Sequence, residues 1–257
     1  MKPLNTPPIT FKTFLFSAAL LGITACKNQS PVDKIKDSNI TQEPSSAPAT
    51  TDTPHSSVAE ETPVGSDKAV AHFEAGLEAA NTNNMPLAYK EFLEAANEGH
   101  VYAQYNIGLM YEQGLGIDKN AEQAVNWYEK SAEQGNSAAQ FNLGVCYENG
   151  IGTAVDFSKA NDWYRKASEQ GDGLAVGNLG MLYIRGQGVK VNKVAGIALL
   201  LMSSTMDTSP QNLARKNISS TKGLTPEMVS EAQVLSAEMS DTNNILGPLD
   251  NYLNISG

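Results

Sequence analysis

The sequence predicts an all-α fold, a solenoid of stacked helix-turn-helix repeats, and three observations carry that prediction. Two segments that begin at positions 100 and 136 match along their whole length without a gap, and a fixed period of this size is typical of repeat proteins. Apolar residues within each segment, such as Ala103 and Ile107, recur at helical spacing. A glycine pair, such as Gly114 and Gly116, then follows, where positive φ angles can end a helix.

The residues shared by the two segments define a repeat signature. This signature resembles the Sel1-like repeat, a subclass of the tetratricopeptide repeat, over roughly residues 67–207. The resemblance implies a right-handed α/α superhelix that serves as an interaction scaffold. The recurring residues are Gly108, Tyr111, Gly114, Gly116, Ala124, Trp127, Tyr128, Lys130 and Gly135, which return as Gly144, Tyr147, Gly150, Gly152, Ala160, Trp163, Tyr164, Lys166 and Gly171.

Residues 1–25 have the pattern of a bacterial lipoprotein signal peptide. Lys2 and Lys12 give it positive charge, and the apolar run that follows is too short to span a bilayer. The sequence Ile-Thr-Ala-Cys resembles a lipobox, which implies that Cys26 is lipidated and begins the mature protein. A plain signal peptide with an unmodified cysteine is the alternative. Because Lys27 is not the aspartate that resembles an inner-membrane retention signal, we expect an outer-membrane anchor that faces the periplasm.

Residues 26–66 are predicted to form a disordered tether behind the lipidated cysteine. They are rich in proline, serine and threonine and contain no aromatic residue. Such a segment cannot bury enough apolar surface to offset the entropy lost on ordering. We therefore expect it to hold the folded part of the chain away from the membrane.

The remaining chain divides into successive units. In the first unit a short Asn-rich loop with Pro86 replaces the glycine pair, as expected of an atypical capping repeat. In the fourth, Leu199 and Leu200 stand where Trp and Tyr recur, which predicts a helix buried under C-terminal elements. The units are a degenerate tetratricopeptide-like repeat at 67–99, regular repeats at 100–135 and 136–171, a divergent repeat at 172–207, capping helices at 208–240 and a flexible tail at 241–257.

Apolar stripes, glycines and capping residues set the expected helix limits. Thr225, Pro226 and Glu227, for example, are an N-cap, a proline at the first helical position and a first-turn acid. Helices are expected near residues 69–80, 86–98, 101–113, 121–134, 137–149, 157–170, 173–185, 193–204, 210–219 and 226–240.

Composition and motifs exclude several function classes. The formal net charge of −10 argues against nucleic acid, whose phosphates require a basic face. His55, His72 and His100 show no metal-ligand spacing, so neither a metal site nor a cofactor is predicted. Cys146 takes a core position in its repeat and is interpreted as a packing residue rather than a nucleophile. Since no nucleophile elbow, phosphate loop or dinucleotide fingerprint is present, no catalytic residue is predicted.

Eight side chains of the first helices are predicted to line a partner-binding groove. In tetratricopeptide domains, the position of the recurring asparagine lines the concave groove, where an amide can hold a peptide backbone. The alternatives are a local role for the asparagines and packing between units for the aromatic residues. Glu112 and Glu148 form either an acidic stripe that faces a ligand or plain solvated surface. A catalytic acid–base pair is disfavoured, because equivalent helices of neighbouring repeats lie about 10 Å apart. The candidates are Tyr102, Tyr105, Asn106, Glu112, Phe141, Asn142, Glu148 and Asn178.

The sequence and the resemblance together predict a non-catalytic scaffold or adaptor lipoprotein of the bacterial cell envelope. We expect its partner to be another envelope protein or a peptide, with a preference for a basic segment because of Glu112 and Glu148. The membrane would be contacted only through the lipid on Cys26. Two alternatives stay open: an immunity-type inhibitor of a periplasmic toxic enzyme, and an envelope enzyme such as a wall hydrolase or a β-lactam-acting protein.

Overall fold

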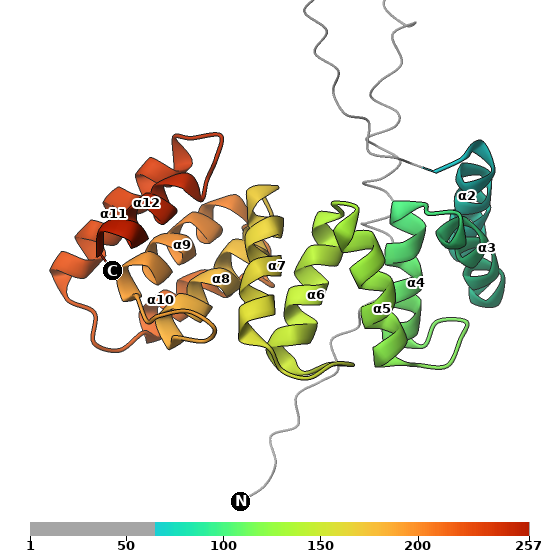
Figure 1. Cartoon of the computed structure of the whole chain (residues 1–257), viewed down its shortest axis with the longest axis horizontal. Coiled ribbons are helices and arrows are strands. Elements are labelled where there is room, and N and C mark those ends of the chain that lie inside the picture. Colours follow the sequence, from blue (N-terminus) through green and yellow to red (C-terminus); the bar gives the residue numbers. More distant parts are fainter. Residues whose placement is uncertain (1–64, 257) are drawn as a thin grey trace, which may run out of the picture. The chain divides into compact units, whose positions relative to one another are not determined.

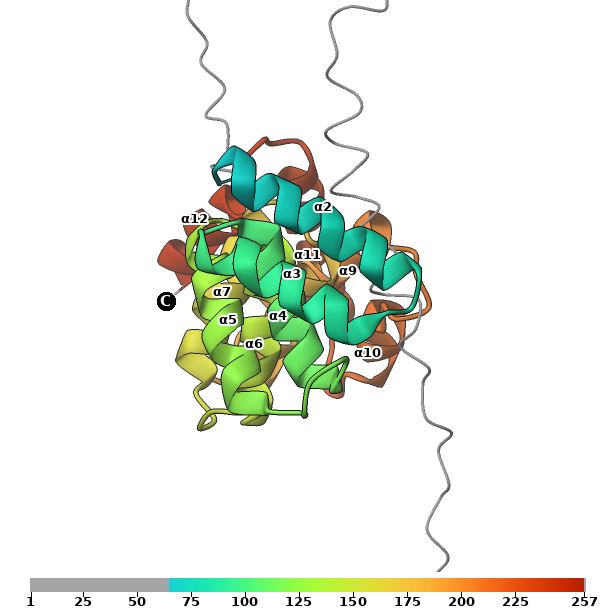
Figure 2. The ribbon, with the colours of Figure 1, turned by 90° about the vertical axis from the view of Figure 1, so that its right-hand side faces the viewer.

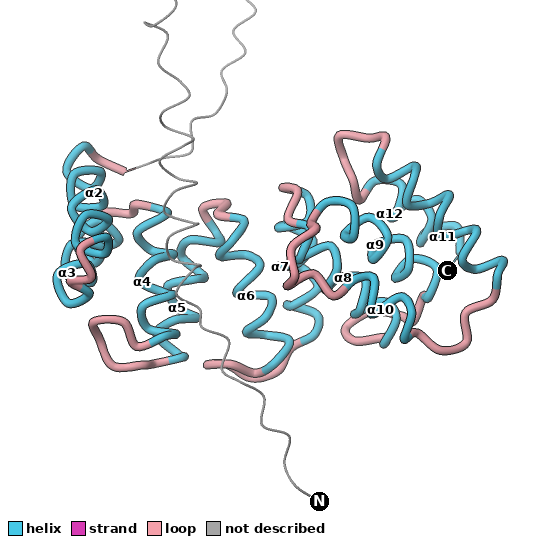
Figure 3. The backbone as a smooth tube through the Cα atoms, turned by 180° about the vertical axis from the view of Figure 1, so that it is seen from behind, coloured by secondary structure: helices cyan, strands magenta, loops and turns pink. Residues whose placement is uncertain are grey.

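The computed structural model describes residues 65–256, and every regular element in that range is an α-helix (Figure 1; Figure 3). The predicted signal peptide, Cys26 and nearly all of the predicted tether lie outside the described residues. None of the described helices has the length and apolar content needed to cross a bilayer. The helices are α2 (Asp67–Asn81), α3 (Met85–Asn97), α4 (Val101–Gln113), α5 (Ala121–Glu133), α6 (Ser137–Asn149), α7 (Phe157–Glu169), α8 (Gly173–Arg185), α9 (Lys193–Met206), α10 (Ala214–Ser220), α11 (Pro226–Ser240) and α12 (Gly247–Ser256).

The observed helices lie close to the predicted ones. Helices α4, α6, α8 and α11 have the predicted limits, and only α10 starts clearly late, at Ala214 instead of near residue 210. Successive helices pack against each other in antiparallel pairs, and Figure 2 shows the first pair, α2 and α3, nearest the viewer. The predicted all-α solenoid of helix pairs is therefore confirmed.

Helices α4, α6 and α8, the first helices of three successive repeats, begin and end in the same way. The N-cap side chains of His100, Asn136 and Asp172 each accept a hydrogen bond from the backbone N–H three residues further on. The C-cap glycines adopt the left-handed conformation, with φ of 74° at Gly114 and 70° at Gly150. The recurring residues at these positions are therefore the ones that set the helix ends.

The second glycine of each pair brings its loop against the preceding repeat. A Cβ atom on Gly152 would lie 2.2 Å from the carbonyl oxygen of Ala121, and one on Gly188 would lie 2.4 Å from that of Phe157. Backbone atoms cannot move aside as a flexible side chain can, so only glycine fits here. This loop contact helps to fix how successive repeats stack.

Polar side chains also join neighbouring repeats. The Gln104 side chain donates to the Ala96 carbonyl at 3.2 Å, and Gln140 repeats this bond with Ala132 at 3.0 Å. Both glutamines are almost fully buried, so their amides need such partners. Stacking is therefore specified by buried hydrogen bonds as well as by apolar contact.

The C-terminal end differs from the prediction. The segment expected to be a flexible tail instead contains helix α12, so this prediction is wrong. Leu246 and Leu249 are fully buried, and their three-residue spacing is helical. Gly247 and Pro248 suggest a loop in the sequence, but they occupy the start of the helix, where proline is tolerated.

Helix α9 is enclosed by other helices, as the divergence of its repeat predicts. It packs against α8, α10 and α11 (Figure 1). Leu199 and Leu200 have no exposed surface. The Trp and Tyr of the regular repeats are therefore replaced by leucines in a second helix whose residues 194–200 are all buried.

Candidate functional site

Helices α6 and α8 share an open face. On each helix the half-buried and exposed residues recur every three to four positions, whereas most residues between them are buried. Because α6 and α8 are the first helices of their repeats, we call this surface the first-helix face. It consists of Phe141, Asn142, Val145, Glu148, Asn178, Met181, Ile184 and Arg185.

The predicted groove residues are placed unevenly. Phe141, Asn142, Glu148 and Asn178 belong to the first-helix face. The α4 residues do not continue it uniformly: Tyr105 is 7% and Asn106 is 4% exposed, whereas Tyr102 is 39% exposed. Glu112 is half-buried. The structure therefore brings four of the eight candidates onto one open surface.

The two glutamates of the predicted acidic stripe are each bonded within their own repeat. The Tyr128 hydroxyl donates to Glu112 at 2.6 Å, and the Tyr164 hydroxyl donates to Glu148 at 2.8 Å. Burial and the neighbouring carboxylate raise the pKa of Tyr128 and of Tyr164 above the ordinary value, so both hydroxyls stay protonated donors. Each glutamate is thus part of the bond between first and second helix.

The asparagine amides are held by tyrosine hydroxyls. Asn178 Nδ2 donates to the Tyr164 hydroxyl at 3.1 Å. Burial raises the pKa of Tyr105 to about 12, and the nearby Asn142 side chain, acting as a donor, opposes this rise. In the first unit Phe92, which has no hydroxyl, packs against Gly76 as Tyr128 packs against Gly108 and Tyr164 against Gly144.

Sequence reasoning missed the tyrosine partners, although a signal for them was present. Tyr128 and Tyr164 recur with the same period as Glu112 and Glu148. Residues that recur with the same period on two helices packed against each other are candidates for contact. In the sequence both tyrosines stand out only as members of the repeat signature.

Arg185 brings positive charge to the end of the first-helix face. Its guanidinium lies 3.7 Å from Glu148, longer than a hydrogen bond, and its side chain is 51% exposed. The pair joins the C-terminal ends of α6 and α8. It also offsets the charge of Glu148, whereas no Lys, Arg or His within residues 65–256 pairs with Glu112.

Cys146 is a core residue, as predicted. It is 4% exposed, and burial together with the Glu112 charge raises the pKa of its thiol to about 12. A thiol with such a pKa is a poor nucleophile at neutral pH. Within the described part of the chain, His, Cys, Asp and Glu form no cluster of three that could hold a metal ion.

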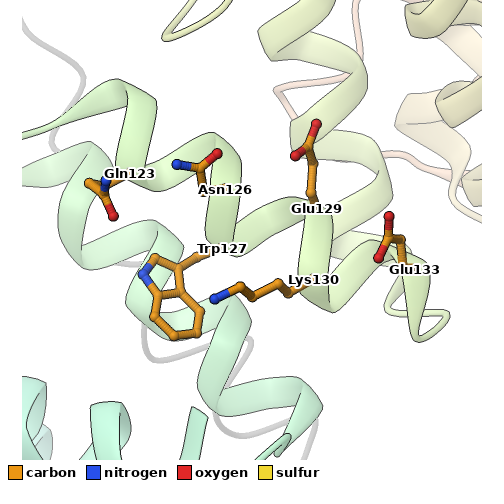
Figure 4. Close-up of a pocket in the computed structure, with 6 residues that line it drawn as sticks. All are labelled: Gln123, Asn126, Trp127, Glu129, Lys130 and Glu133. Carbon is orange, nitrogen blue, oxygen red and sulfur yellow. The ribbon is translucent and has the colours of Figure 1, made fainter. Parts of the chain in front are cut away.

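The second helices carry a different feature, a lysine stacked on each tryptophan. Lys130 Nζ lies 3.8 Å from the ring centre of Trp127, and Lys166 repeats this distance over Trp163. A surface pocket of about 360 Å³ lies beside the first stack (Figure 4). All of its lining residues come from α5: Gln123, Asn126, Trp127, Glu129, Lys130 and Glu133.

A family model and a solved structure with a TM-score above 0.5 agree with this architecture. The family model described as the Sel1 repeat matches residues 101–136, 137–172 and 174–207. A Sel1 repeat protein from Oxalobacter formigenes is 31% identical, with a TM-score of 0.55 over 66% of this chain and 73% of that chain. A protective antigen of uropathogenic Escherichia coli with an SLR fold is 29% identical, with a TM-score of 0.42 over 66% of this chain and 45% of that chain.

One curated relative matches over a short stretch. It is a chitin synthase regulator of Saccharomyces cerevisiae, 43% identical over 56 residues. The match covers 22% of this chain and 8% of the regulator. Most of that protein therefore has no counterpart in this chain.

Proposed function

Because the chain belongs to the family of Sel1-repeat proteins, which are generally scaffolds for protein–protein interaction, we propose that it is a non-catalytic adaptor of the bacterial cell envelope. Its first-helix face holds another envelope protein or a peptide. The observation that carries this proposal is the open face itself. Six apolar or amide-bearing positions on α6 and α8 are only half-buried among residues 65–256, and this is the surface a partner would cover.

The envelope location rests on the N-terminal sequence. Residues 1–25 would direct export, and the lipid on Cys26 would anchor the protein in the outer membrane, facing the periplasm. Replacing Cys26 with Ser should abolish metabolic labelling with a fatty-acid probe and release the protein from the membrane fraction. Normal labelling of this variant would contradict the anchor.

Site-specific photo-crosslinking in the bacterial envelope tests the adaptor function. A photoreactive residue at Val145 lies on the first-helix face, and one at Asp162, which is exposed on α7, is the matched control. We expect a discrete adduct with one envelope protein from position 145 and none from position 162. Adducts from position 162 alone, or from neither position, would reject the first-helix face as the docking surface.

A further inference from the structure

The loops that join the two helices of each repeat lie along one edge of the solenoid. Figure 1 shows the loops after α4 and α6 at this edge, at the bottom of the view. The loop after α8 joins them, since a Cβ atom on Gly188 would lie 2.4 Å from the carbonyl oxygen of Phe157, at the start of α7. The turn before α11 joins them as well, because Lys193 Nζ donates to the Lys222 carbonyl at 2.9 Å. The loop edge is defined here as residues 114–120, 150–156, 186–193 and 221–225.

Aliphatic side chains of the loop edge are exposed to solvent. Val155 and Val191 take equivalent positions in successive loops and are 53% and 54% exposed, and Ile151 is 39% exposed. The loops hold their shape, since the backbone N–H groups of Asp156 and Asn192 each donate at 2.9 Å to the carbonyl of the tyrosine nine residues earlier. A loop that is already ordered loses little conformational entropy when a ligand covers it. These side chains therefore form a preorganised apolar contact.

Basic residues gather in the C-terminal part of the same edge. Residues 185–224 contain six of the 18 Lys and Arg residues of the chain and only one of its 28 Asp and Glu residues. Lys190 and Lys222 are exposed, and Lys193 bonds the turn that contains Lys222. Glu227, in the first turn of α11, offsets one of these charges at most. This part of the loop edge is therefore positive, although the chain as a whole carries a net charge of −10.

Most acidic residues of the solenoid lie too far away to cancel this charge. Glu133, Glu169 and Asp207 stand at the other ends of the second helices, on the opposite edge. A helix of 13 residues such as α7 is about 20 Å long, whereas exposed charges in physiological salt are screened beyond about 8 Å. Asp118 and Asp156 belong to the two earlier loops. An anionic surface placed against the lysine-rich part would therefore interact mainly with the lysines.

We propose that the loop edge, through its lysine-rich C-terminal part, binds the surface of a bilayer that contains anionic phospholipids. Lysines near such a surface are attracted to its headgroups, and their long side chains keep the charge there while neighbouring apolar groups enter the interface. Separate loop tips offer little of the continuous area that a stable protein interface buries, so the observations favour a lipid surface over an acidic protein.

This contact goes beyond the proposed adaptor function. It departs from the expectation that the membrane is contacted only through the lipid on Cys26. Binding at the loop edge would fix the orientation of the solenoid on the membrane, which a lipid on a long tether does not do. The first-helix face would stay available for a partner, because it is made of helical residues outside the loop edge.

Vesicle flotation with the full chain carrying Cys26→Ser, which removes the lipid attachment site, tests the proposal. We expect binding to vesicles of phosphatidylglycerol and phosphatidylcholine to exceed binding to phosphatidylcholine alone. Lys190→Gln with Lys222→Gln should weaken it at least about tenfold, since each lysine near an anionic surface contributes about fivefold. Lys68→Gln with Lys90→Gln, on exposed positions of α2 and α3, removes the same charge and should bind like the parent. Equal binding of the two double variants would overturn the proposal, because binding would then not depend on the loop edge.

A fluorophore reports whether the aliphatic side chains enter the bilayer. An environment-sensitive dye is attached through Val191→Cys, or through Val234→Cys at a 58% exposed valine in the middle of α11 as the matched control. Cys146 is buried and should not react in the folded chain. We expect the emission at position 191 to shift to the blue with anionic vesicles and the emission at position 234 to stay unchanged. An unchanged spectrum at position 191, or an equal shift at position 234, would contradict the proposal.

An acidic protein is the alternative occupant of the loop edge. In that case a photoreactive residue at position 191 would give a discrete protein adduct in the bacterial envelope, while the chain would leave anionic vesicles unbound. That pair of results would reject the lipid surface as the ligand. Neither outcome touches the adaptor proposal, whose crosslinking test uses position 145 on the first-helix face.

Discussion

The α6–α7 and α8–α9 repeats are alike in the caps of their first helices and differ in the side-chain pair that joins the first helix to the second. In the α6–α7 repeat Tyr164 packs against Gly144 and donates to Glu148. In the α8–α9 repeat Leu200 packs against Gly180 at the equivalent place, and the residue one period after Glu148 is Ile184. The polar pair of one repeat thus becomes an apolar pair in the next.

The difference follows from what covers each second helix. Tyr164 directs its hydroxyl toward the half-buried Glu148, at the edge of the open face. Helix α9 is covered by α10 and α11 and Leu200 is fully buried, so a hydroxyl at that position would be costly, and a carboxylate at the half-buried Ile184 would have no such donor. Because Tyr164 and Glu148 are replaced together, by Leu200 and Ile184, we infer that the two residues act as one unit. In the α8–α9 repeat the same positions are used for apolar packing.

The largest expected effect is a loss of stability at Trp127, Trp163 and Leu199, which occupy equivalent positions in successive repeats. Trp127→Ala should cost about 3–5 kcal/mol and Leu199→Ala about 2–5 kcal/mol, because both side chains are buried and each substitution leaves a cavity. Trp163 is only half-buried, so Trp163→Ala should cost less. Denaturant unfolding followed by circular dichroism measures these values. A loss at Trp163 as large as that at Leu199 would break the comparison.

The second effect concerns the helix caps and appears only at low pH. His100 caps α4 where Asn136 and Asp172 cap α6 and α8; it is 1% exposed and stacks on Phe73. Burial lowers the pKa of His100 from 6.5 to about 4. Between these values the unfolded chain binds the proton more readily, so stability is complete above about pH 6.5 and is lost as the pH falls toward 4.

The loss should reach at most about 3 kcal/mol. His100→Asn, which installs the cap found at position 136, should flatten this part of the pH profile. Unfolding free energies measured from pH 7 to pH 4 provide the check. An unchanged slope in the variant would show that another group causes the pH dependence.

A smaller effect probes the polar pair directly. Tyr164→Phe should cost about 1–2 kcal/mol, because it removes the hydrogen-bond partner of Glu148 and of Asn178. Combined with Glu148→Ala, its cost should be non-additive by about 0.5 kcal/mol or more. Leu200→Ala combined with Glu148→Ala should be additive, since Leu200 belongs to the next repeat. Additivity in both cycles would mean that Tyr164 and Glu148 do not act as a unit.

The smallest expected effect concerns the ion pair that joins α12 to α7. Arg165 Nη2 lies 2.7 Å from both carboxylate oxygens of Asp250, but the Asp250 side chain is 47% exposed. Asp250→Asn should therefore cost no more than about 1 kcal/mol, and less at high salt. Thermal melts at two ionic strengths test this. A loss as large as that of a core leucine would show that the pair controls docking of α12.

The sequence by itself determined the elements that depend on local interactions. The period, the glycine pairs and the N-cap residues act within a few positions of one another, so they fix the limits of α4, α6 and α8 and the division into repeats. They did not distinguish among the eight predicted groove residues, of which Phe141, Asn142, Glu148 and Asn178 lie together on one open face.

Only the tertiary structure decided what depends on contacts between distant segments. Helix α12 is stabilised where Leu246 and Leu249 are buried and where Asp250 meets Arg165, which is 85 residues away in the chain. The packing of neighbouring helices likewise decides which tyrosine hydroxyls bond Glu112, Glu148 and Asn178. It also decides that Tyr105 and Asn106 are buried. Periodicity shows which residues share a helix face, but the energy of burying that face is set by whatever segment covers it, and no local pattern encodes that segment.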